Sequence, residues 1–226
     1  MHIPAIRGLL FDLDGVLCDT AKYHYLAWKR LANELGFDFT EEQNEELKGI
    51  SRIDSLTYLL KLGEKKLTVD QFEDFLVLKN TWYLELIKEM TPNHLLPGVL
   101  HFLESSKNEG IKIGLGSSSK NAPLILKTLN ITGFFDCIVD GNSVTKSKPN
   151  PEIFLFGASQ LNLQPSECVV FEDATSGVDA ALAGGFLCVG IGNQKTLNKA
   201  TFVYSGFKEL DFNTFVKSLS KYERSL

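Results

Sequence analysis

Two pairs of acidic residues are placed where they could hold a metal ion. Asp12 and Asp14 follow an apolar segment that ends at Phe11, and Glu172 and Asp173 follow another apolar segment. Because residues two apart on a strand point the same way, Asp12 and Asp14 would lie close together and repel each other without a cation. An oxygen-rich cluster of this kind suits a hard cation such as Mg2+. Taken alone, the same acids could equally be turn or helix-capping residues.

Two further apolar segments lead into residues that could bind phosphate. Ser117 follows the segment 111–116 and precedes a predicted helix, so its hydroxyl and nearby backbone N–H groups could bind an anion. Lys148 precedes another predicted helix and offers a positive charge for phosphate oxygens. A serine-rich turn or a single lysine usually has no such function when it occurs alone. Four such features at four predicted strand ends favour a site for phosphate and a metal.

The segments that carry these residues alternate between the sequence pattern of β-strands and that of α-helices. We expect strands near 6–11, 111–116, 137–139, 168–171 and 187–191, and helices near 98–109, 121–129, 151–162, 175–183 and 212–222. Strands that alternate with helices predict an α/β fold, with a Rossmann-like parallel sheet covered by helices on both faces. In such sheets ligands bind at the carboxyl ends of the strands. The candidate residues all follow predicted strands or open predicted helices at that edge.

The segment from about residue 20 to residue 90 interrupts this alternation. Its apolar residues recur at helical spacing up to Leu35, and further helices are expected near 41–48, 54–62 and 69–89. Thr40 and Thr68 each precede a glutamine by three residues, which is typical of a capping box at a helix start. We therefore expect an all-helical cap domain over 20–90, inserted into a catalytic core of 1–19 and 91–226.

The composition excludes several classes of protein. The 226 residues include 28 acidic and 23 basic ones, a net charge of −5 that argues against a nucleic-acid partner. No apolar stretch reaches the roughly 20 residues needed to cross a membrane, and the first residues do not resemble a secretion signal. The four cysteines lack metal-binding spacing, which favours buried thiols and a cytoplasmic location.

The order of the acidic and phosphate motifs resembles the haloacid dehalogenase-like phosphotransferases over nearly the whole chain. By this resemblance Asp12 is the nucleophile that takes the phosphoryl group, and Asp14 is the general acid and base. Ser117 and Lys148 would bind the transferring phosphate. The resemblance also implies Mg2+ as cofactor, with ligands from Asp12, Asp14, Glu172 and Asp173.

Parts of the insertion resemble the cap of the beta-phosphoglucomutase branch of that superfamily. The similar segments are 19–28, 47–56 and 79–80, together with 119–121 in the core. The resemblance implies that Arg52 holds the non-transferring phosphate and that Thr20 and His24 assist catalysis by Asp14. The resemblance implies that Asp12, Asp14, Ser117 and Lys148 also bind the substrate. The further substrate-binding residues it implies are Trp28, Lys48, Gly49, Arg52, Lys79, Ser118, Ser119, Lys120 and Asn121. Without the resemblance of all these segments together, His24 and Trp28 would be interpreted as packing residues.

The resemblance implies a Mg2+-dependent phosphomutase. It would interconvert beta-D-glucose 1-phosphate and D-glucose 6-phosphate through a phosphorylated Asp12 and a beta-glucose 1,6-bisphosphate intermediate. The expected partners are small sugar phosphates, with the bisphosphate as activator, and the expected state is a monomer. Two alternatives remain, namely a sugar-phosphate phosphatase of the same superfamily and a non-enzymatic phosphosugar-binding module. The presence of Asp12, Asp14, Lys148 and Asp173 argues against the latter.

Overall fold

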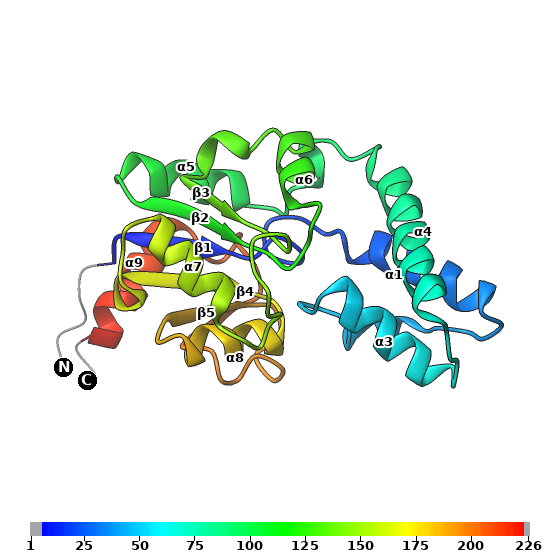
Figure 1. Cartoon of the computed structure of the whole chain (residues 1–226). Helices are drawn as coiled ribbons and strands as arrows, with labels where there is room; N and C mark the ends of the chain where they lie inside the picture. Colours follow the sequence, from blue (N-terminus) through cyan, green and yellow to red (C-terminus); the bar gives the residue numbers. More distant parts are fainter. Residues whose placement is uncertain (1–5, 224–226) are drawn as a thin grey trace.

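A six-stranded parallel sheet lies at the centre of residues 6–223, the part of the chain that the computed structural model describes (Figure 1). The strands are β1 (Gly8–Phe11), β2 (Lys112–Gly116), β3 (Cys137–Val139), β4 (Cys168–Glu172), β5 (Leu187–Ile191) and β6 (Phe202–Tyr204). Their spatial order is β3-β2-β1-β4-β5-β6, and all neighbours are parallel. Because the strand order reverses direction at β1, the carboxyl ends of β1 and β4 border the crevice where such sheets bind ligands.

The five predicted strands are present, and β6 is an addition that the sequence analysis missed. Its three residues are only partly buried at the edge of the sheet, next to β5. A strand that short produces no apolar segment that stands out from the surrounding sequence. The periodicity therefore carried too little signal to predict it.

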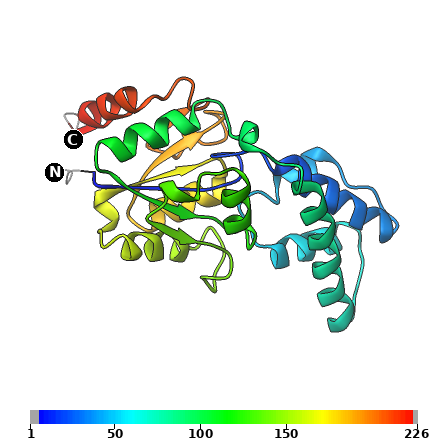
Figure 2. The ribbon, with the colours of Figure 1, turned by 90° about the horizontal axis from the view of Figure 1, so that it is seen from above.

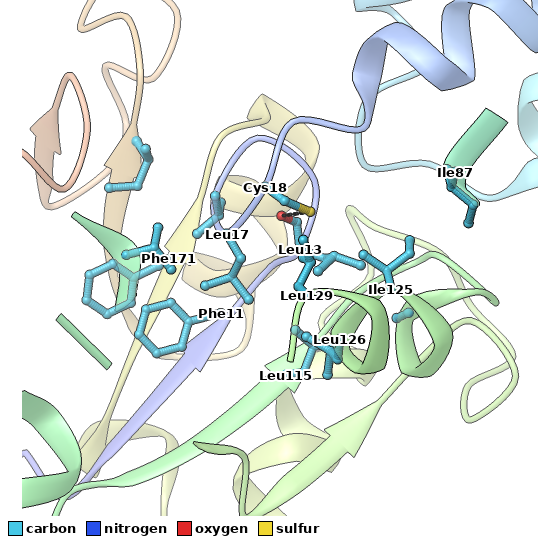
Figure 3. Packing of buried hydrophobic residues seen from close by; sticks show 14 of the residues in the cluster. Phe11, Leu13, Leu17, Cys18, Ile87, Leu115, Ile125, Leu126, Leu129 and Phe171 are labelled. Atoms are coloured by element: carbon cyan, nitrogen blue, oxygen red, sulfur yellow. Dashed lines mark hydrogen bonds between the residues drawn. The ribbon is translucent and has the colours of Figure 1, made fainter. Parts of the chain in front are cut away.

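Helices cover both faces of the sheet because successive strand residues point to opposite sides. Leu9 and Phe11 pack with residues of α5 (Val99–Asn108), α6 (Ala122–Thr128) and α9 (Phe212–Glu223). Leu10 and Val170 pack with residues of α7 (Glu152–Gln160) and α8 (Thr175–Ala183) on the other face. Figure 3 shows the first of these clusters, in which the rings of Phe11 and Phe171 stack with centroids 4.6 Å apart. This packing holds the carboxyl ends of β1 and β4 in a rigid frame.

The insertion forms a separate helical lobe beyond the carboxyl ends of the strands (Figures 1 and 2). Its helices are α1 (Ala21–Glu34), α2 (Glu41–Glu45), α3 (Arg52–Leu62) and α4 (Val69–Ile87). The two predicted capping boxes are present at Thr40 and Thr68, where each threonine hydroxyl accepts a hydrogen bond from the N–H of the glutamine three residues on. The predicted fold class, a Rossmann-like core with an inserted all-helical cap, is confirmed. The domain limits at residues 20 and 90 stay a prediction.

Two exclusions drawn from the sequence can be compared with the structure. The four cysteines are free thiols; three of them are buried and Cys137 is half-buried. Within residues 6–223, no helix is both long and apolar enough to span a bilayer.

Candidate active site

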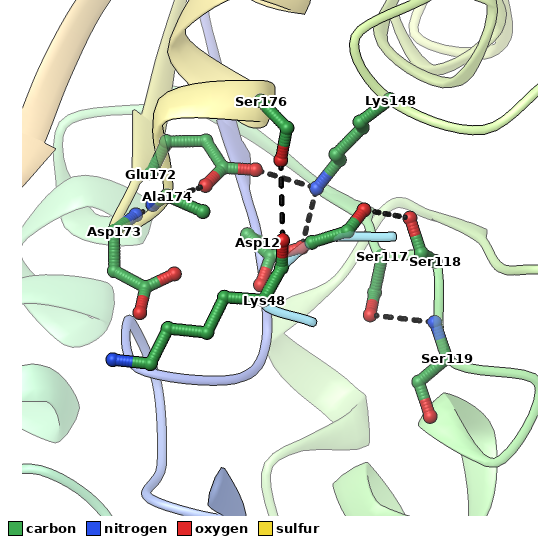
Figure 4. Close-up of polar contacts among 11 residues, drawn as sticks. Asp12, Lys48, Ser117, Ser118, Ser119, Lys148, Glu172, Asp173, Ala174 and Ser176 are labelled. Atoms are coloured by element: carbon green, nitrogen blue, oxygen red, sulfur yellow. Dashed lines mark hydrogen bonds and ion pairs between the residues drawn. The ribbon is translucent and has the colours of Figure 1, made fainter. Parts of the chain in front are cut away.

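A buried lysine joins the ends of β1 and β4. The ammonium of Lys148 donates hydrogen bonds to the carboxylates of Asp12 and Glu172, at 2.5 Å and 2.6 Å (Figure 4). All three side chains are almost entirely withdrawn from solvent. Buried charges are tolerated when they are paired in this way, and removing one partner is strongly destabilising. Lys148 thus offsets the negative charge of two adjacent strand ends.

The pKa values of this pair follow from burial and charge together. Burial by itself lowers the pKa of Lys148, but the charges of Asp12 and Glu172 raise it above its usual value. Burial raises the pKa of Glu172, and Lys148 partly opposes that rise. The second oxygen of Glu172 accepts hydrogen bonds from the N–H groups of Asp173 and Ala174, at 3.0 Å and 3.1 Å. Glu172 therefore orients the turn into α8 as well as the ammonium of Lys148.

The carboxyl of Asp14 has a raised pKa. Burial and the nearby charge of Asp12 raise the pKa of Asp14 to about 8, close enough to neutral pH for its carboxyl both to take and to give a proton. Its buried Oδ1 has no hydrogen-bond partner among residues 6–223. A carboxyl group whose pKa is raised in this way is suited to act as a general acid. The geometry suits Asp14 to give a proton to a leaving oxygen and to take it back.

The strand ends also fit a Mg2+ ion. Burial and the charges of Glu172 and Asp12 raise the pKa of Asp173 well above its usual value, so a divalent cation would offset an excess of negative charge there. No three His, Cys, Asp or Glu side chains of residues 6–223 form a complete metal site by themselves. Mg2+ commonly takes only one or two protein carboxylates and completes its shell with water and phosphate oxygens. Asp12, Asp14, Glu172 and Asp173 stay the predicted protein ligands, and both oxygens of Glu172 also accept hydrogen bonds, from Lys148 and from the N–H groups of Asp173 and Ala174.

The loop after β2 forms the second wall of the site. The buried hydroxyl of Ser117 accepts a hydrogen bond from the N–H of Ser119 at 3.2 Å, and the hydroxyl of Ser119 accepts one from the N–H of Asn121 at 3.3 Å. The turn at Gly141 packs against this loop so closely that a Cβ there would lie 2.3 Å from the carbonyl oxygen of Ser118. The hydroxyl and N–H groups of the loop are thus held at one edge of the cleft.

The cap contributes a buried cation to the opposite wall. Lys79 on α4 is 1% exposed, and its ammonium lies 2.8 Å from Nδ1 of His24. The same ammonium lies over the rings of Trp28 and Tyr83, at 4.5 Å and 4.8 Å from their centroids. Burial, followed by the charge of Arg52, lowers the pKa of Lys79, and burial also lowers the pKa of His24. His24 is therefore neutral near pH 7, and its Nδ1 shares a hydrogen bond with the Lys79 nitrogen.

One cleft of about 90 Å³ between core and cap brings most of the predicted residues together. Those that line it are Asp12, Asp14, His24, Trp28, Lys48, Gly49, Arg52, Lys79, Ser117, Ser118, Ser119, Lys120, Asn121 and Asp173. Thr20, Lys148 and Glu172 are buried behind the lining, at the start of α1 and next to Asp12. The functional roles predicted for all these residues stay predictions.

Several lining residues were missed by the sequence analysis. Asn44 on α2 is buried, and its carboxamide oxygen has no hydrogen-bond partner among residues 6–223. Ser55 on α3 also lines the cleft, but its hydroxyl donates to the carbonyl of Ser51 at 2.9 Å. Both residues lie on helices whose amphipathic pattern does not distinguish a cleft from an ordinary core. Ser55 lies in the segment 47–56 that resembles the family's cap, but nothing in the sequence marked Asn44.

The comparisons with known proteins agree with this geometry. Residues 9–191 match the model of the haloacid dehalogenase-like hydrolase family. The chain belongs to that family. It is 41% identical to the beta-phosphoglucomutase of Bacillus subtilis (strain 168), over 96% of this chain and 97% of that protein. It is 34% identical to the phosphorylated carbohydrates phosphatase of Thermotoga maritima, over 80% of this chain and 82% of that protein.

A solved structure shows the same arrangement of core and cap. The beta-phosphoglucomutase of Clostridium difficile superposes with a TM-score of 0.93 and 42% identity, over 96% of this chain and 98% of that one. The resemblance inferred from the sequence motifs is thereby confirmed, both for the superfamily and for its beta-phosphoglucomutase branch. The prediction that the chain is an enzyme of this type is confirmed by the same similarities.

Proposed function

We propose that this chain interconverts beta-D-glucose 1-phosphate and D-glucose 6-phosphate. The observation that carries the proposal is the cleft itself, in which the paired carboxyls of Asp12 and Asp14 face a cap wall that bears His24, Arg52 and Lys79. Such a cleft can hold a phosphate at the sheet edge and a sugar with a second negative group beneath the cap. The similarity to the Bacillus subtilis beta-phosphoglucomutase supports the choice of sugar.

The reaction starts from the enzyme phosphorylated on Asp12. The sugar's 6-hydroxyl attacks the phosphorus as the bond to the Asp12 oxygen breaks, and the carboxylate of Asp14 takes the hydroxyl proton. The resulting 1,6-bisphosphate turns around in the cleft. Asp12 then attacks the phosphorus on the 1-oxygen, and Asp14 returns the proton to that oxygen as glucose 6-phosphate forms. The pKa of about 8 at Asp14 suits a group that both takes and gives this proton.

Other residues of the cleft hold the reacting groups in place. Lys148 and Ser117 bind the oxygens of the transferring phosphoryl group, which carries most of the charge in the transition state. Bound Mg2+, held by the four predicted acidic ligands, would neutralise part of that charge. Arg52, whose planar fork suits phosphate, would hold the second phosphate with Ser119 and Asn121.

The proposal includes three finer expectations. The bisphosphate serves as activator because it phosphorylates Asp12, and the enzyme acts as a monomer in the cytoplasm. The alternative is a sugar-phosphate phosphatase, in which water replaces the sugar hydroxyl as acceptor; the similarity to the Thermotoga maritima phosphatase keeps this open. The basic and aromatic cap residues that close over Asp12 favour the mutase, because a closed cleft excludes water.

Phosphorus NMR of the purified enzyme tests the choice between these reactions. The sample contains beta-glucose 1-phosphate, Mg2+ and a trace of beta-glucose 1,6-bisphosphate. Glucose 6-phosphate without an equal release of free phosphate supports the mutase, and free phosphate as the main product contradicts it. Asp12→Asn, which keeps the size of the side chain but removes the nucleophile, should abolish turnover while circular dichroism shows an intact fold.

A further inference from the structure

Two hydroxyl groups of the core hold the cap loop that crosses the active site. The hydroxyl of Ser118 donates a hydrogen bond to the carbonyl of Gly49 at 2.9 Å, and that of Ser176 donates to the carbonyl of Lys48 at 3.3 Å (Figure 4). The two acceptors are consecutive carbonyls of one loop between α2 and α3. Both bonds join parts of the chain more than 60 residues apart in the sequence.

The two donors come from either side of the nucleophile. Ser118 follows β2 and Ser176 lies in the first turn of α8, after β4. β1, which ends just before Asp12, lies between β2 and β4 in the sheet. The loop is therefore bound at two points that flank Asp12 on either side.

A side chain at position 49 would be strained, both by the backbone conformation and by its close neighbours. Gly49 has a φ of +74°, which side chains other than glycine rarely adopt. A Cβ at this position would lie 2.6 Å from the hydroxyl oxygen of Ser176 and 3.3 Å from the Cβ of Ala174. The loop thus packs closely against the start of α8.

We infer that Ser176, together with Ser118, is a positioning residue that keeps the cap closed over phosphorylated Asp12. This inference rests on the proposed mutase function. Transfer to the sugar hydroxyl requires the closed cleft, whereas water reaches the phosphoryl group when the cap is open. The two hydroxyls therefore set how the phosphoryl group is divided between sugar and water. Ser176 does not line the cleft, so it acts through the loop and not on the substrate.

The test measures the ratio of free phosphate to glucose 6-phosphate formed from beta-glucose 1-phosphate and a trace of the bisphosphate. A hydrogen bond of this kind contributes enough to change an equilibrium by about 2- to 12-fold. We expect Ser176→Ala to raise the ratio at least about twofold, since its bond is the longer one, and Ser118→Ala to raise it further. Ser176→Thr keeps the hydroxyl and should retain the wild-type ratio.

Thr175→Ala is the matched control. Thr175 is exposed in the same helical turn, and its hydroxyl makes no hydrogen bond within the described residues. A variant that merely folds less well makes less of both products, so the ratio separates positioning from stability. If the wild type is a mutase and Ser176→Ala gives the ratio of Thr175→Ala, the inference is wrong and the proposed function stands. If the wild type releases only free phosphate, the mutase proposal fails and the inference fails with it.

Discussion

Removing the ammonium of Lys148 should destabilise the folded enzyme strongly. The Lys148 ammonium lies 2.5 Å from the buried carboxylate of Asp12 and 2.6 Å from that of Glu172. In Lys148→Met an apolar side chain replaces it, and both carboxylates lose their shared counter-charge. Removing one partner of a buried ion pair costs about 3–5 kcal/mol. For a chain of 226 residues this corresponds to a fall in Tm of about 6–20 °C, at about 2–4 °C per kcal/mol.

The assay is urea unfolding followed by circular dichroism at pH 7.5, without Mg2+. Lys199→Met is the matched control, because the Lys199–Asp179 pair has a similar distance of 2.8 Å but is exposed to solvent. Exposed pairs contribute about 1 kcal/mol or less. Adding Glu172→Gln to Lys148→Met should restore part of the loss, since only one unpaired carboxylate then remains. Equal effects of Lys148→Met and Lys199→Met would refute the reasoning.

Three further predictions concern pH, metal and the cap loop. Burial, Lys79 and Arg52 lower the pKa of His24, so below about pH 6.5 only the unfolded chain takes up this proton. Stability should therefore fall by up to about 1.4 kcal/mol per pH unit as the pH drops from 6.5, and His24→Gln should reduce that slope in urea unfolding. Mg2+ at about 100 times its Kd should raise the wild-type Tm by about 5–11 °C in a thermal scan, and Asp173→Asn should remove most of this rise. Gly49→Ala forces a strained backbone, with φ +74°, and a contact of 2.6 Å with the hydroxyl of Ser176. It should lower kcat/KM for the mutase reaction about 5- to 30-fold in a coupled assay of glucose 6-phosphate formation.

Each of these predictions has an outcome that contradicts it. An unchanged pH slope in His24→Gln would show that other groups cause the acid sensitivity. A Mg2+-dependent rise in Tm that persists in Asp173→Asn would place the metal elsewhere. Gly133→Ala is the control for Gly49→Ala, because nothing lies within 4 Å of a Cβ at that position. Equal activity of these two glycine variants would mean that the close approach of the loop has no role in catalysis.

The core and its principal acids could be predicted because their signals are local. The apolar segment before Asp12 is long enough to identify a buried strand, and both acids follow directly after its carboxyl end, although β1 itself stops at Phe11. The glutamines that follow Thr40 and Thr68 mark helix starts by hydrogen bonds within four residues. β6 lacked such a signal because it is short and only half-buried.

Contacts between distant segments were decided only by the tertiary structure. Lys148 meets Asp12 across 136 residues of sequence, and the sequence could place Asp12 after a strand and Lys148 before a helix without showing that they bond to each other. The raised pKa of Asp14 and the lowered pKa of His24 both arise from burial between core and cap, which no single segment encodes. Nothing in the local sequence distinguishes Ser176 from other helical serines. It contacts the cap only because folding brings the carbonyl of Lys48, 128 residues away in the sequence, to its hydroxyl. The sequence by itself therefore determined which chemical groups are available, and folding decided their distances, their burial and hence their charge.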